Sequence, residues 1–146
     1  MELTESWIQQ VDAANGHAQT PPAENENLLR LEEILAKRQL TSFFQPILNL
    51  ASGQIFSYEA LIRGPSDSPL HAPANLFKAA EMGNCLAELE RQCRHVALES
   101  FVKLQLPGRL FLNVSPECLL QADFRQGETL RLIHQLGLNP SQVMIE

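Results

Sequence analysis

The chain has 146 residues, of which 45% are hydrophobic and 19% are charged, a composition typical of a globular protein rather than a disordered one. Its net charge of −6 argues against binding to a DNA or RNA polymer, because such proteins usually carry a basic patch. The length also excludes a complete (β/α)8 barrel, which takes about 250 residues.

The N-terminus and the cysteines indicate the compartment. Residues 1–5 are acidic and lack the basic and apolar regions of a signal peptide. No stretch reaches the roughly 18 apolar residues that a membrane-spanning helix needs. The three cysteines are an odd number, which suits reduced thiols. We therefore expect a cytoplasmic protein with no membrane segment in this chain.

The N-terminal segment is expected to form a helix and a linker ahead of the main domain, with the helix packed on that domain or on a partner. Residues 3–14 are predicted to form a short amphipathic helix, because three apolar side chains recur four residues apart: Leu3, Trp7 and Val11. Residues 19–25 contain two adjacent prolines and are predicted to form a linker. This divides the chain into a helix and linker over residues 1–25 and a main domain over residues 26–146.

The main domain is predicted to open with a helix and a β-hairpin. A helix over residues 27–39 would place four apolar side chains on one face: Leu28, Leu31, Ile34 and Leu35. The apolar run 43–48 predicts a strand, and the turn-forming residues 51–54 separate it from a second strand over 55–63. Because only a short turn joins them, we expect these strands to pair in antiparallel fashion.

The rest of the chain alternates helices and strands. The expected elements are helices over 76–82, 86–104 and 128–136, strands over 110–114 and 143–146, and a further helix capped by Ser115. Asn75 is the expected N-cap of the first of these helices, which ends at Gly83. This order predicts an α/β protein built from βα units.

Polar residues fall at the ends of three predicted strands. In βα folds, ligands bind at the carboxyl ends of the strands, where Glu59, Asn113 and Glu146 are placed. Two carboxylates and an amide make a hard oxygen site that suits Mg²⁺ or Mn²⁺. A structural hydrogen bond from Asn113 to the following turn is the alternative for that residue.

Glu59 and Arg63 share one face of the second strand. A separation of four residues places them roughly 13 Å apart, at about 3.3 Å per residue, which is too far for a salt bridge. This spacing suits the two ends of an extended ligand, with a cation at the carboxylate and a phosphate at the guanidinium. A charged pair that simply faces solvent is the alternative.

Several segments together resemble the signatures of EAL domains, which are bacterial cyclic di-GMP phosphodiesterases. The matching segments are Phe44-Gln45-Pro46-Ile47, Tyr58-Glu59-Ala60-Leu61-Ile62-Arg63, Leu112-Asn113-Val114-Ser115 and Ile145-Glu146. Their order and spacing carry the resemblance, which begins near residue 43 and runs to residue 146. The implied fold is the first part of a modified (β/α)8 barrel with an antiparallel opening hairpin, preceded by N-terminal helices.

The resemblance also implies roles for individual residues. The implied metal ligands, for Mg²⁺ or Mn²⁺, are Glu59, Asn113 and Glu146. The implied contacts to the dinucleotide are Gln45, Leu61 and Arg63, with Arg63 on a phosphate. The implied reaction is hydrolysis of cyclic di-GMP to linear pGpG, in which the cations lower the pKa of the attacking water.

The later family elements, a paired aspartate motif, a lysine, a further glutamate and a glutamine, have no counterparts in this sequence. We therefore expect no hydrolysis by these 146 residues alone. The alternative is a non-catalytic EAL module that acts as a cyclic di-GMP receptor or a protein-interaction domain. A third reading is an unrelated α/β protein in which Glu59 and Glu146 act as an acid/base pair. The family resemblance also allows a homodimer.

Only about 104 residues follow the start of the first predicted strand, fewer than half of what a whole barrel takes. An open half-barrel would expose a continuous apolar patch and two unpaired sheet edges. We therefore expect these residues to aggregate, to pair with another copy, or to belong to a longer chain.

Overall fold

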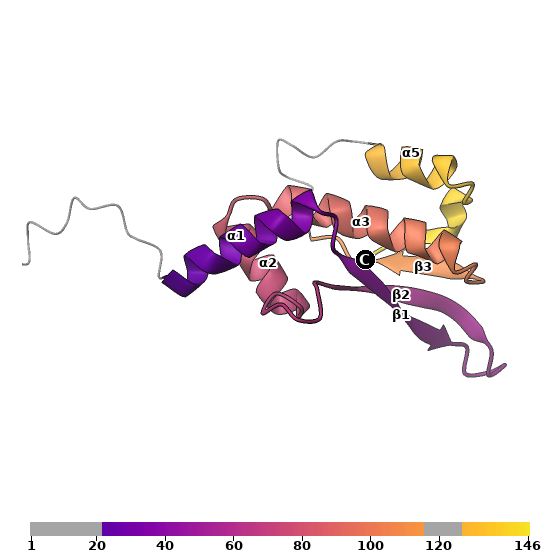
Figure 1. Cartoon of the computed structure of the whole chain (residues 1–146). Coiled ribbons are helices and arrows are strands. Elements are labelled where there is room, and N and C mark those ends of the chain that lie inside the picture. The colour runs from indigo at the N-terminus through magenta and orange to yellow at the C-terminus, as the bar shows by residue number, and fades with distance from the viewer. Residues whose placement is uncertain (1–21, 116–126) are drawn as a thin grey trace, which may run out of the picture.

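The structure is a computed structural model that describes residues 22–115 and 127–146 (Figure 1). The helix expected at 3–14 and the body of the helix expected after Ser115 lie outside these residues. The first described element, α1 (Pro22–Ala36), begins at Pro22 rather than at residue 27. The predicted linker is therefore wrong for residues 22–25. A proline is tolerated in the first helical turn because its missing N–H would have no helical partner there.

The described residues form a four-stranded sheet in the order β1-β2-β3-β4. The strands are β1 (Thr41–Leu48), β2 (Ile55–Arg63), β3 (Arg109–Leu112) and β4 (Val143–Ile145). β1 and β2 pair in antiparallel fashion, which confirms the predicted hairpin, whereas β3 and β4 add parallel strands. In the hairpin turn Gly53 takes a φ of 67°, a left-handed conformation that glycine adopts without a steric penalty.

Three helices follow the hairpin in the described residues. They are α2 (Pro73–Met82), α3 (Leu86–Lys103) and α5 (Glu128–Gln135), and a short 3-10 helix η3 (Pro140–Gln142) leads into β4. The N-cap of α2 is Ala72, so the prediction of Asn75 as the cap is wrong. Asn75 instead donates from its amide to the carbonyl of Pro69 at 2.9 Å. Gly83 ends α2 as predicted.

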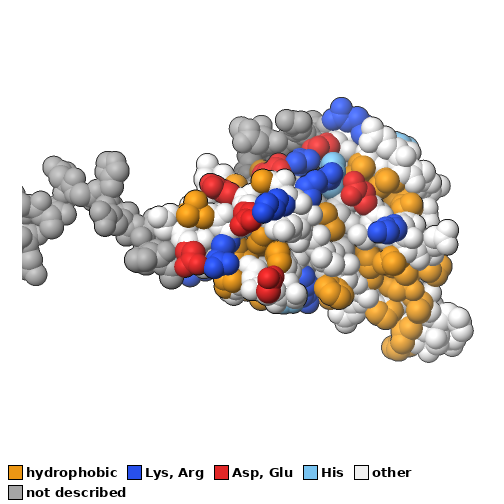
Figure 2. Space-filling view, in the orientation of Figure 1, with side chains coloured by type: hydrophobic (Ala, Val, Ile, Leu, Met, Phe, Trp, Pro, Cys, Tyr) orange, Lys and Arg blue, Asp and Glu red, His pale blue; other side chains and the backbone are white. Residues whose placement is uncertain are grey.

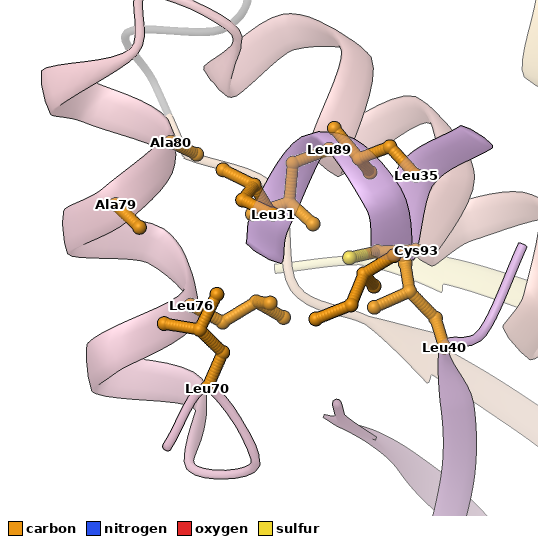
Figure 3. Packing of buried hydrophobic residues seen from close by; sticks show 10 residues of the cluster. Leu31, Leu35, Leu40, Leu70, Leu76, Ala79, Ala80, Leu89 and Cys93 are labelled. Carbon is orange, nitrogen blue, oxygen red and sulfur yellow. The ribbon is translucent and has the colours of Figure 1, made fainter. Parts of the chain in front are cut away.

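Within the described part of the chain there are two apolar cores, and the first lies where α1 packs against α2 and α3 (Figure 3). Its larger buried side chains come from these helices and from the segments that join them to the sheet: Leu31, Ile34, Leu35, Leu40, Leu70, Leu76 and Leu89. This core holds the helices together at the end of the sheet where β2 finishes.

The second core lies between α3, α5 and the sheet. Phe101 of α3 packs against two rings of the hairpin, with centroid distances of 6.0 Å to Phe44 and 6.3 Å to Tyr58. Leu110 and Leu112 of β3 belong to the same cluster. In these strands the residues that alternate with the buried ones must face away from the helices.

The other face of the sheet is open in the described structure. Phe43 is 55% exposed and Met144 is 38% exposed, and further exposed apolar side chains surround the hairpin turn: Ile47, Leu48, Leu50, Ile55 and Phe56. Figure 2 shows hydrophobic side chains gathered over the β1–β2 hairpin. β1 and β4 form the two edges of the described sheet. The apolar patch and the two edges expected of an open half-barrel are thus present.

Removing a buried leucine side chain of α3 should destabilise the domain. Leu98 is 0% exposed, whereas Leu50 in the hairpin turn is 96% exposed. We expect Leu98→Ala to lower the free energy of unfolding by about 2–5 kcal/mol, because it removes apolar contacts and leaves a cavity. The matched variant Leu50→Ala should change it by less than about 0.5 kcal/mol. Urea denaturation followed by circular dichroism measures both; equal effects would contradict the described core.

Candidate functional site

Two of the predicted polar residues meet where the parallel pairing of β2 and β3 ends: Glu59 lies in the middle of β2, and Asn113 directly follows β3. The Asn113 amide donates from Nδ2 to Oε1 of Glu59 at 2.8 Å, across two neighbouring parallel strands. Glu59 lies beside Phe111 in the strand register, and Asn113 follows Phe111 by two residues, just beyond the end of β3, which places it on the same face. Tyr58 and Leu112 face α3 and α5, which places Glu59 and Asn113 on the open face of the sheet.

Glu146 lies opposite Asn113 on the next strand. Its backbone N–H donates to the carbonyl of Leu112 at 3.0 Å, and its carbonyl accepts from the N–H of Val114 at 2.9 Å. These two bonds continue the parallel pairing of β3 and β4 by one residue, so the side chains of Glu146 and Asn113 project on the same side. Three neighbouring strands therefore present Glu59, Asn113 and Glu146 toward one face.

The chemistry of these side chains fits a divalent cation. Because Asn113 turns its Nδ2 toward Glu59, its Oδ1 is the amide atom that can act as a ligand. Two carboxylates and one amide oxygen are a donor set for Mg²⁺ or Mn²⁺ rather than for Zn²⁺. Among residues 22–115 and 127–146 no group of three His, Cys, Asp or Glu side chains could hold a metal ion. An ion at this site would thus depend on the amide as well as on the carboxylates.

The residues predicted to contact a dinucleotide lie around this site. Gln45 is the partner of Glu59 across the antiparallel β1–β2 pair and is exposed. Leu61 and Arg63 follow Glu59 on the same face of β2, and both are half-buried. The Arg63 Nη1 donates to the carbonyl of Ile62 at 2.7 Å. A guanidinium has five N–H donors, so this single bond still permits a bidentate contact with an anion.

A cavity of about 200 Å³ opens beside the site, between the ends of β2 and β3 and the helices α2 and α3. Three of its lining residues were predicted to belong to the site: Leu61, Arg63 and Asn113. Three others were not: Phe77, Cys93 and Arg94. Cys93 and Arg94 come from α3 and reach the cavity only because that helix crosses the sheet. The sequence held no local signal that they lie near Asn113.

A buried ion pair on α3 was also missed by reasoning from the sequence. The side chains of Glu90 and Arg94 are 4% and 8% exposed, and Glu90 Oε2 lies 3.7 Å from Arg94 Nη1. The available signal was their spacing of four residues on the helix predicted over residues 86–104. That spacing is common on solvent-exposed helix faces and does not by itself indicate burial.

The described residues form a mixed α/β domain in which three oxygen-bearing side chains, Glu59, Asn113 and Glu146, share one face of the sheet. The family model of the EAL domain matches residues 28–146, so the chain belongs to the EAL domain family. This confirms the resemblance read from the motifs.

Similar solved structures confirm the predicted fold class. The EAL domain of Xanthomonas citri FimX, solved in complex with c-diGMP, is 21% identical, with a TM-score of 0.67 over 86% of this chain and 51% of that one. Klebsiella pneumoniae BlrP1, solved as a complex with manganese and cyclic di-GMP, is 26% identical, with a TM-score of 0.63 over 73% of this chain and 26% of that one.

A protein relative is also similar in sequence. The uncharacterized protein y4lL of Sinorhizobium fredii is 30% identical over 118 residues, which are 80% of this chain and 14% of that protein. The chain therefore spans about half, or less, of the proteins it resembles. None of the helices described over residues 22–115 and 127–146 has the length and apolarity to cross a bilayer.

The thiol that lines the cavity should be unreactive in the folded protein. The pKa of Cys93 is raised to about 12, mainly by burial. The negative charge of Glu90 also raises this pKa, and its effect is larger than the opposite effect of Arg94. A raised pKa leaves almost no thiolate, the reactive form, at pH 8. Burial raises the pKa of the half-buried Cys85 as well, but its side chain is accessible, so we expect iodoacetamide at pH 8 to modify Cys85 slowly and to leave Cys93 unmodified, as followed by peptide mass spectrometry.

Unfolding supplies the control for this prediction. In urea, Cys93 should react at the rate of an ordinary cysteine, since the burial that raises its pKa is gone. Equal rates for Cys93 in the folded and unfolded protein would contradict the described burial.

Proposed function

We propose that this chain is part of a cyclic di-GMP phosphodiesterase domain that hydrolyses cyclic di-GMP to pGpG. In this proposal the ligands of Mg²⁺ or Mn²⁺ are Glu59, Asn113 and Glu146, and the contacts to the dinucleotide are Gln45, Leu61 and Arg63. The observation that supports it best is the 2.8 Å bond between Asn113 and Glu59, which brings together two side chains from separate strands at the expected end of the sheet.

The proposed chemistry divides the work between carboxylates and a guanidinium. A bound cation would lower the pKa of the attacking water and neutralise charge on the phosphodiester. Glu59 and Glu146 supply the negative charge that attracts the ion, and the Asn113 amide adds a neutral ligand. Arg63, at the edge of the cavity, would take a phosphate oxygen of the dinucleotide. Gln45 lies beside Glu59, where it can donate to the same ligand.

We place this activity in the cytoplasm. Cys85 and Cys93 are free thiols in the described structure, as expected of a reducing compartment. A homodimer and the absence of a nucleic-acid polymer as partner remain predictions from the sequence.

Ion binding by the site is tested by Mn²⁺ titration of the 146-residue chain, followed by electron paramagnetic resonance. Glu59→Gln removes one of the proposed ligand charges, and we expect it to weaken Mn²⁺ binding by at least about 10-fold. The matched control is Glu81→Gln, because Glu81 is an exposed glutamate at the end of α2, away from the strand ends. Equal affinities in the two variants would contradict the proposed ligands.

Hydrolysis tests whether these residues suffice for catalysis. This chain should show no turnover of cyclic di-GMP above a buffer control with Mg²⁺ or Mn²⁺, because the paired aspartates and the lysine of the family are missing from its sequence. The product pGpG is measured by liquid chromatography. Turnover that Glu59→Gln abolishes would show that these residues suffice for catalysis and would overturn the prediction. A receptor module is the alternative, and it predicts dinucleotide binding that Glu59→Gln leaves unchanged.

A further inference from the structure

We infer that Glu90 is a positioning residue, whose buried carboxylate holds the segment after β3 so that Asn113 points at Glu59. This inference rests on the proposed function, because it gives Glu90 a role only if Glu59 and Asn113 bind an ion. Glu90 lies on α3, on the far side of the sheet from the open face, and does not reach the proposed ion itself.

The burial of Glu90 needs a physical reason. A carboxylate that is 4% exposed loses most of its hydration, which is unfavourable unless partners replace the lost water. Arg94, one helical turn further along, supplies the opposite charge at 3.7 Å. Replacing both residues by apolar ones could also give a stable core, so the pair is not explained by stability alone.

The other oxygen of Glu90 binds the chain immediately after Asn113. Oε1 accepts a hydrogen bond from the Ser115 hydroxyl and a longer one from the Ser115 backbone N–H at 3.4 Å. Ser115 is two residues beyond Asn113. The carboxylate thus binds the backbone directly behind the proposed ligand.

The segment that carries Asn113 is therefore held from both sides. On one side β4 binds the backbone of Leu112 and Val114 through the two hydrogen bonds of Glu146. On the other side Glu90 binds Ser115. Asn113 lies between these attachments, and its own side chain is exposed, so few packing contacts fix its direction. Ligand groups must be held to within about 0.5 Å for tight binding, and here backbone attachment provides that restraint.

Arg94 extends the same network. Its Nε donates to the Thr129 hydroxyl of α5 at 3.1 Å, and its side chain lines the cavity that Asn113 and Arg63 share. The buried pair thus joins α3 to the end of β3 and to the start of α5. A substitution on α3 can therefore reach the proposed ion site through Ser115 without touching it.

Two variants test the inference in the 15N-labelled 146-residue chain. Ser115→Ala removes one hydroxyl and leaves the Glu90–Arg94 pair in place, whereas Glu90→Gln removes the charge itself. Glu99→Gln is the matched control, because Glu99 is an exposed glutamate on the same helix. The measurements are the side-chain NH₂ signal of Asn113 by NMR, the affinity for Mn²⁺, and the urea midpoint of unfolding.

We expect Ser115→Ala and Glu90→Gln each to shift the Asn113 NH₂ signal and to weaken Mn²⁺ binding by about 10-fold, the size of effect typical of groups that orient a metal ligand. Glu99→Gln should change neither. A lower urea midpoint for Glu90→Gln does not affect the test. If Glu90→Gln unfolds, Ser115→Ala alone tests the inference. An unchanged Asn113 signal with unchanged Mn²⁺ affinity in Ser115→Ala would overturn the inference.

The same measurements distinguish failure of the proposed function from failure of the positioning role of Glu90. If the unmodified chain binds no Mn²⁺ but Ser115→Ala shifts the Asn113 signal, the proposed ion site is wrong while the positioning of Asn113 by Glu90 stands. If the chain binds Mn²⁺ and Glu59→Gln weakens it, but Ser115→Ala does not, the ion site stands and the positioning role is wrong.

Discussion

The packing of α3 across one face of the sheet is the interaction on which the rest of the structure depends. Its apolar residues, Phe101 foremost, bury the rings of Phe44 and Tyr58 from the hairpin. Because side chains alternate along a strand, this burial forces their neighbours, including Glu59, onto the opposite face. The same helix buries Glu90 behind the end of β3. The packing of α3 on the sheet thus determines both the face on which Glu59 lies and the position of Glu90 behind β3.

The open face of the sheet carries both polar and apolar side chains. Polar side chains gather at the carboxyl ends of the strands, while apolar ones such as Phe43 and Met144 lie exposed on the same face. In a closed barrel this face is the interior, which side chains fill in layers. The chain spans 51% of the FimX EAL domain, which accords with a sheet that presents its interior face to solvent. The exposed apolar area is therefore a property of the partial barrel rather than a defect of packing.

Local sequence patterns predicted the limits of an element well where residues next to the boundary, such as turn formers, determine it. The limits of β2 match the prediction at both ends, since turn-forming residues precede it and Gly64 follows it. The starts of α1 and α2 were misplaced: Pro22 was assigned to a linker, and Asn75 was taken as the N-cap of a helix that begins at Pro73. A proline in the first turn is compatible with a helix, and only the packing of the following residues decides between the two readings.

The sequence by itself determined the family, the opening hairpin and the residue types at the strand ends, because the order and spacing of short motifs are written along the chain. It could not determine which of these side chains touch. Asn113 meets Glu59 across 54 residues, and Ser115 meets Glu90 across 25. Such contacts depend on the register of parallel strands and on where a helix crosses them. Those are set by the packing of the whole domain, so only the tertiary structure decided them.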